Sequence, residues 1–232
     1  MLTTENCKLA TMFTGLIEAS GTVVSLAPSS GATRLIIAAP ALAGRWRTGD
    51  SIAVNGVCLT ALPADDPNHF AADLAAETLA RTTLGALPAG ATVNLELPTP
   101  AGSPLGGHVV QGHVDATGWI EGIYPLHADL ETTDWRLTIE APAELTPFIV
   151  SQGSITIDGI SLTVAKVYDS HPDGTIRFDI AIIPHTYRAT NLHRLEAHTK
   201  VNIETDVLAR YAARQAPHND WLTTEFLLAR GY

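Results

Sequence analysis

The sequence repeats itself over long range, and this repeat limits the possible folds more than any other feature. Residues 51–60 match residues 154–163, with Ser, Ile, Gly, Leu and Thr identical in register. Four further pairs of matching segments follow the same order in both halves: 15–21 with 112–118, 34–40 with 136–142, 77–84 with 185–192, and 93–96 with 201–204. The offset grows slowly along the chain, as short loop insertions in a duplicated unit would produce. We therefore expect two similar domains in tandem.

Each half has the pattern of strands joined by tight turns. Short apolar, β-branched runs alternate with Gly, Pro, Asn and Asp. The dipeptides Asn55-Gly56 and Asp158-Gly159 predict hairpin turns, because both central positions of that turn need a positive φ. About six strands in roughly 100 residues favour a small closed barrel over a sandwich, since closure removes exposed edges. The prediction is an all-β fold of two tandem six-stranded β-barrels.

Helical character is predicted at three places. Strand alternation lapses at 76–85 and 187–195, where we expect short helices. Asp206 can cap a longer C-terminal helix, and its apolar face contains Val207, Leu208, Tyr211 and Ala212. Pro217 ends that helix, and a second apolar piece contains Trp221, Leu222, Phe226 and Leu228. The spacing suits packing on the chain's own barrels and contact with another copy equally well.

The predicted parts are an N-terminal extension, two barrels and a C-terminal helical segment, at 1–11, 12–105, 106–205 and 206–232. The extension lacks the cationic start and continuous apolar stretch of a secretory signal. Cys7 and Cys58 are too few for a disulfide framework or, alone, for a structural zinc site. A reducing cytoplasm is the expected location.

Charge and hydropathy exclude several classes of partner. The chain has 14 Lys and Arg against 24 Asp and Glu, a formal net charge of −10, with no basic run. Such a chain repels nucleic-acid phosphates and anionic lipid surfaces. Its longest uncharged apolar stretch, residues 35–44, is interrupted by Pro40 and falls short of the roughly 20 residues that cross a bilayer. We expect neither a nucleic-acid partner nor a membrane partner.

His108 and His113 lie in a glycine-rich segment that could be mistaken for a metal site. Two histidines five residues apart share a helical face only loosely and lie on opposite faces of a strand, so they form a poor ligand pair. The sequence supplies no further ligands at suitable spacing, and we expect no metal. The glycines instead indicate a close approach of the backbone to a ligand or to another chain segment.

The two repeats carry different reactive groups at equivalent positions. Cys58 lies two residues after the Asn55-Gly56 turn, and its counterpart in the second repeat is Ser161. A buried cysteine is usually inert filling. Because a serine replaces it in the other half, the pair suggests two copies of one pocket that hold similar molecules in different roles.

The motifs together resemble the riboflavin synthase alpha-chain family. The resemblance rests on residues 12–18, 55–60, 106–115, 158–163 and 183–186, and it extends over about residues 12–212. It implies a cofactor-free dismutation in which one 6,7-dimethyl-8-ribityllumazine gives a four-carbon unit to a second, forming riboflavin and a ribitylamino-pyrimidinedione. It also implies a homotrimer joined by the C-terminal helix, with the reactive site between barrels of neighbouring subunits. Association with lumazine synthase is left open.

The resemblance also implies two sets of lumazine-binding residues. The first pocket would be lined by Gly15, Leu16, Ile17, Cys58, Leu59, Thr60, Asp73, Leu74, Ala75, Ala76, Glu77 and Thr78. The second would be lined by Gly112, His113, Val114, Ser161, Leu162, Thr163, Ala181, Ile182, Ile183, Pro184, His185 and Thr186. Backbone amides and hydroxyls suit a neutral polar ligand, in agreement with the low Lys and Arg content.

Catalysis would require a base for the C7 methyl of one lumazine and a nucleophile at C7 of the other. His113 is the candidate base, and Ser51, Cys58 or water is the candidate nucleophile. Ser161 and Thr163 would orient the substrate, and Phe13 would stack on the reacting rings.

Two positions depart from the family pattern. Gln152 stands where the family commonly has a lysine, and His185 stands where it often has an acidic residue, so the electrostatics of the second pocket differ. A non-catalytic lumazine- or flavin-binding protein is the main alternative function. A flavoprotein reductase would need a nicotinamide-binding domain for which the last thirty or so residues leave no room, and a duplication without any ligand is the third alternative.

Overall fold

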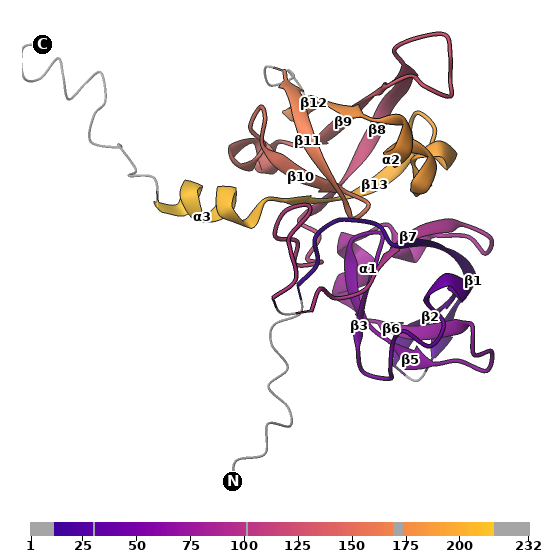
Figure 1. The fold of residues 1–232 in the computed structure, drawn as a ribbon. Helices are drawn as coiled ribbons and strands as arrows, with labels where there is room; N and C mark the ends of the chain where they lie inside the picture. The colour runs from indigo at the N-terminus through magenta and orange to yellow at the C-terminus, as the bar shows by residue number, and fades with distance from the viewer. Residues whose placement is uncertain (1–11, 30, 101, 169–173, 216–232) are drawn as a thin grey trace, which may run out of the picture.

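A computed structural model describes residues 12–29, 31–100, 102–168 and 174–215. It contains two β-barrels side by side, with helix α3 at the edge of the second barrel (Figure 1). The predicted all-β fold with two similar barrels and a C-terminal helix is confirmed. Within the described part of the chain, no helix has the length and apolar character needed to cross a bilayer.

The N-terminal barrel consists of seven strands with short helical pieces between them. The strands are β1 (Ala19–Ser29), β2 (Ala32–Ala38), β3 (Ser51–Val54), β4 (Val57–Thr60), β5 (Leu62–Pro63), β6 (His69–Leu74) and β7 (Thr92–Glu96). The helical pieces are η1 (Pro40–Leu42), α1 (Ala76–Arg81) and η2 (Leu84–Ala86).

The C-terminal barrel consists of six strands and is followed by α3. Its strands are β8 (Ala116–Pro125), β9 (Trp135–Pro142), β10 (Ser154–Ile157), β11 (Ile160–Val167), β12 (Thr175–Ile182) and β13 (Lys200–Thr205). The helical pieces are η3 (Ala143–Phe148), α2 (Pro184–Ala189), η4 (Asn191–Arg194) and α3 (Val207–Gln215).

The two barrels share one strand order. The C-terminal barrel closes in the order β10-β11-β12-β9-β8-β13, and the N-terminal sheet runs β4-β3-β7-β1-β2-β6-β5. Its end strands β4 and β5 are separated only by Ala61, so they together take the place of β11. At the equivalent point β11 stays continuous but its register shifts between Val164 and Lys166. The six predicted strands of the first barrel therefore appear as seven.

Each barrel encloses its own apolar core, because alternate residues of every strand point inward. On β9 the inward residues are Trp135, Leu137, Ile139 and Ala141. Leu35 and Ile37 are the inward residues of β2, the matching strand of the first barrel. This alternation leaves the outward residues free to contact ligands or the other barrel.

The two predicted hairpin turns meet at the centre of the molecule. Asn55, Gly56, Asp158 and Gly159 all have positive φ, as the predicted turns require. A Cβ atom on Gly56 would lie 2.7 Å from the Gly159 nitrogen, and one on Gly159 would lie 2.6 Å from the Gly56 nitrogen. The turns therefore touch backbone to backbone, and only glycine fits at the contact.

Buried amides tie the barrels together around these turns. Asn94 Nδ2 donates to Asp158 O at 3.0 Å, and Asn202 Nδ2 donates to Asn55 O at 2.8 Å. The last strand of each barrel thus reaches the turn of the other barrel. Burial raises the pKa of Asp158 to about 6, although its carboxylate accepts hydrogen bonds from Asn202 N and Asn191 Nδ2.

The predicted helices are present with different boundaries. The segment 76–85 divides into α1 and η2. Helix α2 begins at Pro184 rather than at 187, because the fixed φ of proline suits a first helical position. Asp206 Oδ1 accepts a hydrogen bond from Leu208 N at 2.9 Å at the start of α3, as expected for a cap. Pro217 and the second apolar piece lie outside the described residues.

Candidate functional site

The chain reaches the first strand of each barrel through a lead-in, residues 12–18 before β1 and residues 109–115 before β8. Phe13 N donates to Val110 O at 2.8 Å and Val110 N donates to Phe13 O at 3.1 Å, so the lead-ins pair with each other. Ile17 then packs against the C-terminal core, and Val114 packs against the N-terminal core. The lead-ins are exchanged between the barrels.

Each lead-in covers the hairpin strand that follows the central turn of the opposite barrel. Ser161 N donates to Gly15 O at 2.8 Å, and Cys58 N donates to Gly112 O at 2.9 Å. A Cβ atom on Gly15 or Gly112 would lie 2.6 Å from the Cβ of Ser161 or Cys58. Both glycines are also in the left-handed region, with φ of 75° and 76°. In the glycine-rich segment around the histidines, Gly112 makes this contact, and a Cβ atom on Gly107 would lie 2.0 Å from Thr14 O, so both positions require glycine.

A buried glutamate at the end of each barrel holds its lead-in in place. Glu96 accepts from Thr14 N at 2.7 Å, from the Thr14 hydroxyl at 2.7 Å and from Gly15 N at 3.0 Å. Glu204 accepts from the backbone N–H groups of Gln111, Gly112 and His113 at 2.7, 3.0 and 3.0 Å. Burial raises the pKa of Glu96, and it raises that of Glu204 to about 7.

The sequence reasoning missed these glutamates. Both close the repeated segments 93–96 and 201–204, and a glutamate at the same position of two apolar strands was the available signal.

Cys58 and Ser161 face different partners. Cys58 is half-buried, a free thiol with a hydrogen bond to Ser51. Burial raises the pKa of the thiol, the Ser51 hydrogen bond opposes this, and the negative charge of Glu204 adds to it. The thiol is therefore protonated at neutral pH and needs a base before it can act as a nucleophile.

Ser161 pairs with His108. The Ser161 hydroxyl lies 2.8 Å from His108 Nδ1, and burial lowers the pKa of this imidazole, which is therefore neutral at pH 7. His108 Nε2 is buried and has no hydrogen-bond partner among the residues that the structure describes. The sequence reasoning weighed His108 only as a metal ligand and missed this pair.

Comparison with known proteins matches this two-barrel arrangement. The Lumazine binding domain family matches twice, at residues 14–98 and 111–206. Riboflavin synthase of Mycobacterium bovis is 44% identical over 204 residues, which cover 88% of this chain and 97% of that protein. Riboflavin synthase of Bacillus amyloliquefaciens is 35% identical over 227 residues, covering 95% of this chain and all of that protein.

The chain belongs to the riboflavin synthase family.

Two solved structures share the fold of this riboflavin synthase family member. LumP complexed with riboflavin superimposes with a TM-score of 0.72 at 26% identity, covering 84% of this chain and 99% of LumP. LumP complexed with 6,7-dimethyl-8-(1'-D-ribityl) lumazine gives a TM-score of 0.70 at 24% identity, with the same coverage.

The predicted binding residues of this family member divide according to strand alternation. An exposed face on the first barrel is formed by Thr60 of β4, Asp73 of β6 and Ala75 just after β6. The matching face on the second barrel is formed by Thr163 of β11, Ala181 of β12 and Ile183 just after β12. Four other predicted residues are core residues whose side chains cannot reach a ligand: Leu59, Leu74, Leu162 and Ile182. Only their backbone groups remain available.

The predicted grouping of the lead-in residues is wrong. Gly15, Leu16 and Ile17 were expected beside Cys58, but the exchange places Gly15 against Ser161. Gly112, His113 and Val114 correspondingly belong beside Cys58. The error has a physical cause, because the repeat makes both lead-ins equivalent in sequence and their crossing depends on tertiary contacts.

The predicted role of Phe13 is also wrong. Its side chain is fully buried in a small cluster with Ala53 and Val110, against which Cys58 packs. A ring in that position anchors the lead-in and cannot stack on a ligand at the surface of this chain.

The remaining predicted residues lie at the edges of the two faces. Asp73 forms an exposed ion pair with Arg34 at 2.8 Å, and Glu77 pairs with Arg81 within α1. The side chain of His113 is exposed. Gln152 adopts a left-handed conformation in the turn before β10 and is also exposed. The positions equivalent to Ala76, Glu77 and Thr78 in the second barrel are Pro184, His185 and Thr186, at the start of α2.

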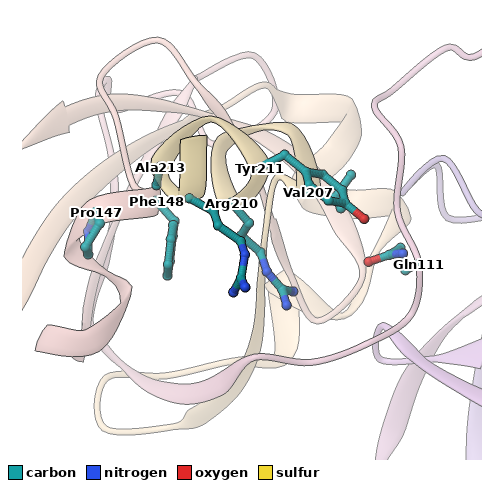
Figure 2. Close-up of a pocket in the computed structure, with 8 residues that line it drawn as sticks. Gln111, Pro147, Phe148, Val207, Arg210, Tyr211 and Ala213 are labelled. Atoms are coloured by element: carbon teal, nitrogen blue, oxygen red, sulfur yellow. The ribbon is translucent and has the colours of Figure 1, made fainter. Parts of the chain in front are cut away.

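A separate cavity of about 600 Å³ lies between α3, η3 and the second lead-in. Figure 2 shows Arg210 extending from α3 between Phe148 and Gln111. Arg210 Nη1 also pairs with Asp115 Oδ1 at 2.7 Å. None of the predicted pocket residues lines this cavity. We attribute the cavity to the packing of α3 beside the second barrel. Within the described ranges, no group of three or more His, Cys, Asp or Glu side chains is placed to hold a metal ion.

Proposed function

We propose that the protein is a riboflavin synthase, a transferase that converts two molecules of 6,7-dimethyl-8-ribityllumazine into riboflavin and 5-amino-6-ribitylamino-2,4-pyrimidinedione. A four-carbon unit leaves one lumazine and joins the other, so the substrate supplies both donor and acceptor. Two copies of one binding fold give two such molecules defined places, and holding both reactants in position can lower the barrier by several kcal/mol.

The observation that carries this proposal is the chemical difference between two equivalent faces. One lead-in covers Cys58 with its Ser51 hydrogen bond, and the other covers Ser161 with its His108 contact. A protein that only binds a ligand has no need for two intact faces with different reactive groups.

The faces contain the groups that the proposed chemistry requires. His108, a neutral imidazole, can accept the proton that leaves the acidic C7 methyl, and the exposed His113 is the other candidate base. Ser51, Cys58 or water supplies the nucleophile, while Ser161 and Thr163 orient the substrate. The position of His108 against the Ser161 hydroxyl adds a base that the sequence reasoning did not assign to catalysis.

One observation favours a second candidate function, a lumazine- or flavin-binding protein without activity. The structural neighbours named LumP are described in complex with a ribityl lumazine, with flavin mononucleotide and with riboflavin.

Turnover separates the two candidates. The purified protein is incubated with 6,7-dimethyl-8-ribityllumazine in buffer with EDTA and without added cofactor, and products are followed by absorbance and chromatography. We expect catalytic formation of riboflavin with one pyrimidinedione per flavin. Binding of the lumazine with altered fluorescence but no riboflavin would instead establish the binding protein.

We also propose a homotrimer assembled through α3. Support comes from Leu208 and Tyr211, which are 65% and 62% exposed on this helix. A cytoplasmic location and an association with lumazine synthase stay predictions.

A further inference from the structure

The helices α1 and α2 occupy equivalent places and carry equivalent pocket residues. Helix α1 follows β6 and helix α2 follows β12, the strands that border the proposed lumazine faces. Glu77 and Thr78 of α1 correspond to His185 and Thr186 of α2 in the repeat. Whatever holds these two helices against their barrels therefore also sets the geometry of the two pockets.

An aromatic stack lies behind α2. The rings of Trp135 and Tyr187 have centroids 3.8 Å apart and planes 13° apart. Trp135 is the first residue of β9 and pairs with Ile182, the last residue of β12. Tyr187 lies one residue beyond Thr186 on α2. The stack thus joins the end of the barrel directly to the helix that carries the pocket residues.

The buried position of Trp135 has an energetic cost. The residue is only 8% exposed, and its indole Nε1 has no hydrogen-bond partner among the residues described. An unpaired buried donor loses the hydrogen bonds it would make to water. A phenylalanine would avoid that loss, so the large indole surface is the feature that the site uses.

The first barrel has no such stack. The residues equivalent to Trp135 and Tyr187 are Thr33 and Leu79, and Thr33 pairs with Leu74 as Trp135 pairs with Ile182. A cavity of about 690 Å³ opens behind α1, and both Thr33 and Leu79 line it. Leu79 packs against the N-terminal core, as Tyr187 packs against the C-terminal core, but it has no ring to stack on and one side of it borders this open groove.

We infer that Trp135 and Tyr187 are positioning residues of the second lumazine pocket: their stack fixes α2, and with it His185 and Thr186, before the ligand binds. The first pocket lacks this stack, so α1 is held there only by the packing of Leu79 and is ordered less firmly before its ligand binds. Pre-ordering a binding segment removes the cost of ordering it on association. This inference rests on the proposed function, because it concerns the lumazine pocket of the second barrel.

The test exchanges residues between the repeats. Tyr187→Leu installs the residue of the first barrel, Tyr187→Phe keeps the ring, and Leu79→Tyr is the matched substitution on α1. Steady-state riboflavin formation gives the lumazine KM and kcat for each variant, thermal unfolding gives Tm, and hydrogen exchange without ligand reports on α1 and α2 separately.

For Tyr187→Leu we expect the KM to rise up to about tenfold, the range that loss of an aromatic pair allows. The kcat at saturating lumazine stays within about twofold, and α2 amides exchange faster while α1 amides do not. Tyr187→Phe restores the wild-type KM and exchange, and Leu79→Tyr leaves α2 exchange unchanged. An unchanged KM with a lower kcat, or unchanged α2 exchange, would overturn the inference.

The exchange measurement keeps the test separate from the proposed function. If the wild-type protein binds lumazine but makes no riboflavin, the synthase proposal fails. The positioning role is then decided by α2 exchange and by riboflavin titration, in which Tyr187→Leu should weaken binding and Tyr187→Phe should not.

Discussion

Cys58 and Ser161 show how a repeated sequence produces two different chemical environments. Both residues lie two positions after a central turn, and both donate their backbone N–H to a glycine of the opposite lead-in. The side chains nevertheless meet different groups, Ser51 for the thiol and His108 for the hydroxyl. The backbone contacts are therefore equivalent in the two repeats, while the side chains at these positions have different hydrogen-bond partners.

The Ser161–His108 contact predicts non-additive losses of activity. Ser161→Ala and His108→Ala should each lower kcat by about 10²-fold, near the lower end of what proton transfer by a positioned group contributes. The double variant should be no worse than the more damaged single variant, because the two groups act as a unit. Steady-state riboflavin formation measures all three, with thermal unfolding as the control for folding. Losses that multiply in the double variant would show that the residues act independently.

The sequence located the equivalent positions of the two repeats, but it did not determine the orientation of the side chains there. The repeat singled out Cys58 and Ser161, and the structure places both on the faces covered by the lead-ins. It could not reveal that Phe13 is buried, because an aromatic residue near a chain start suits a core and a ligand equally well. His108 was missed because its partner Ser161 is 53 positions away and meets it only in the folded chain.

Among the elements, the lead-ins depend on a buried carboxylate whose charge varies with pH. The folded-state pKa of Glu204 is raised from 4.5 to about 7 by burial. Between these values the folded state binds more protons than the unfolded state. The contribution of Glu204 to the free energy of unfolding is therefore fully present below pH 4.5 and is lost as the pH rises through about 7.

Glu204→Gln should remove this contribution. Relative to the variant, the wild type should lose about 3 kcal/mol of unfolding free energy as the pH rises from 4 to 8. Each unit of difference between the folded and unfolded pKa of Glu204 corresponds to about 1.4 kcal/mol. Urea denaturation across that range measures it, and Glu144→Gln on the exposed surface serves as the matched loss of one charge. A difference that stays constant with pH would mean that Glu204 is not the group responsible.

The elements were easier to predict than their boundaries and crossings. Alternation of apolar residues located the strands, and the Asn-Gly and Asp-Gly turns appeared where they were expected. The interruption between β4 and β5 at Ala61 depends on local packing, whereas the start of α2 at Pro184 follows from the fixed φ of proline, a signal that the sequence did contain. The crossing of the lead-ins was beyond the sequence, since Ile17 and Val114 occupy equivalent positions and suit either core.

For the molecule as a whole, the contact between the barrels is specified by hydrogen bonds rather than by apolar area alone. Asp158 and Asn191 belong to the second barrel, and Asn94 of the first barrel bonds to both. Each amide has a fixed direction of donation, so the network accepts one arrangement of the two barrels.

This directionality predicts a reciprocal rescue. Asp158→Asn turns an amide toward Asn191 Nδ2 and leaves two donors facing each other, a loss of about 1–3 kcal/mol. Asn191→Asp places two carboxylates together and should be worse. The double exchange Asp158→Asn with Asn191→Asp restores the pair and should recover most of the stability. Chemical denaturation of the three variants measures the coupling, and purely additive losses would contradict the assigned donors.

The proposed trimer makes a separate prediction about α3. Leu208→Glu and Tyr211→Glu place charge on its exposed apolar face, and both should shift the protein from trimer to monomer in light scattering after size exclusion. Gln215→Glu adds the same charge at the exposed end of the described helix and should leave the assembly intact. A Leu208→Glu protein that remains trimeric would exclude this face from the contact.

The exchange of the lead-ins has a consequence for how separate halves of the chain would assemble. Phe13 and Val110 are equivalent in the repeat, and they pair with each other across the centre of the molecule. Two identical half-length chains could make the same contact if the lead-in of each packed against the barrel of the other. A single barrel alone would leave the backbone N–H of its hairpin strand uncovered. The exchange is thus the arrangement that two identical half-length chains would adopt as a dimer, and it predicts that separately expressed halves will assemble with each other in size-exclusion chromatography.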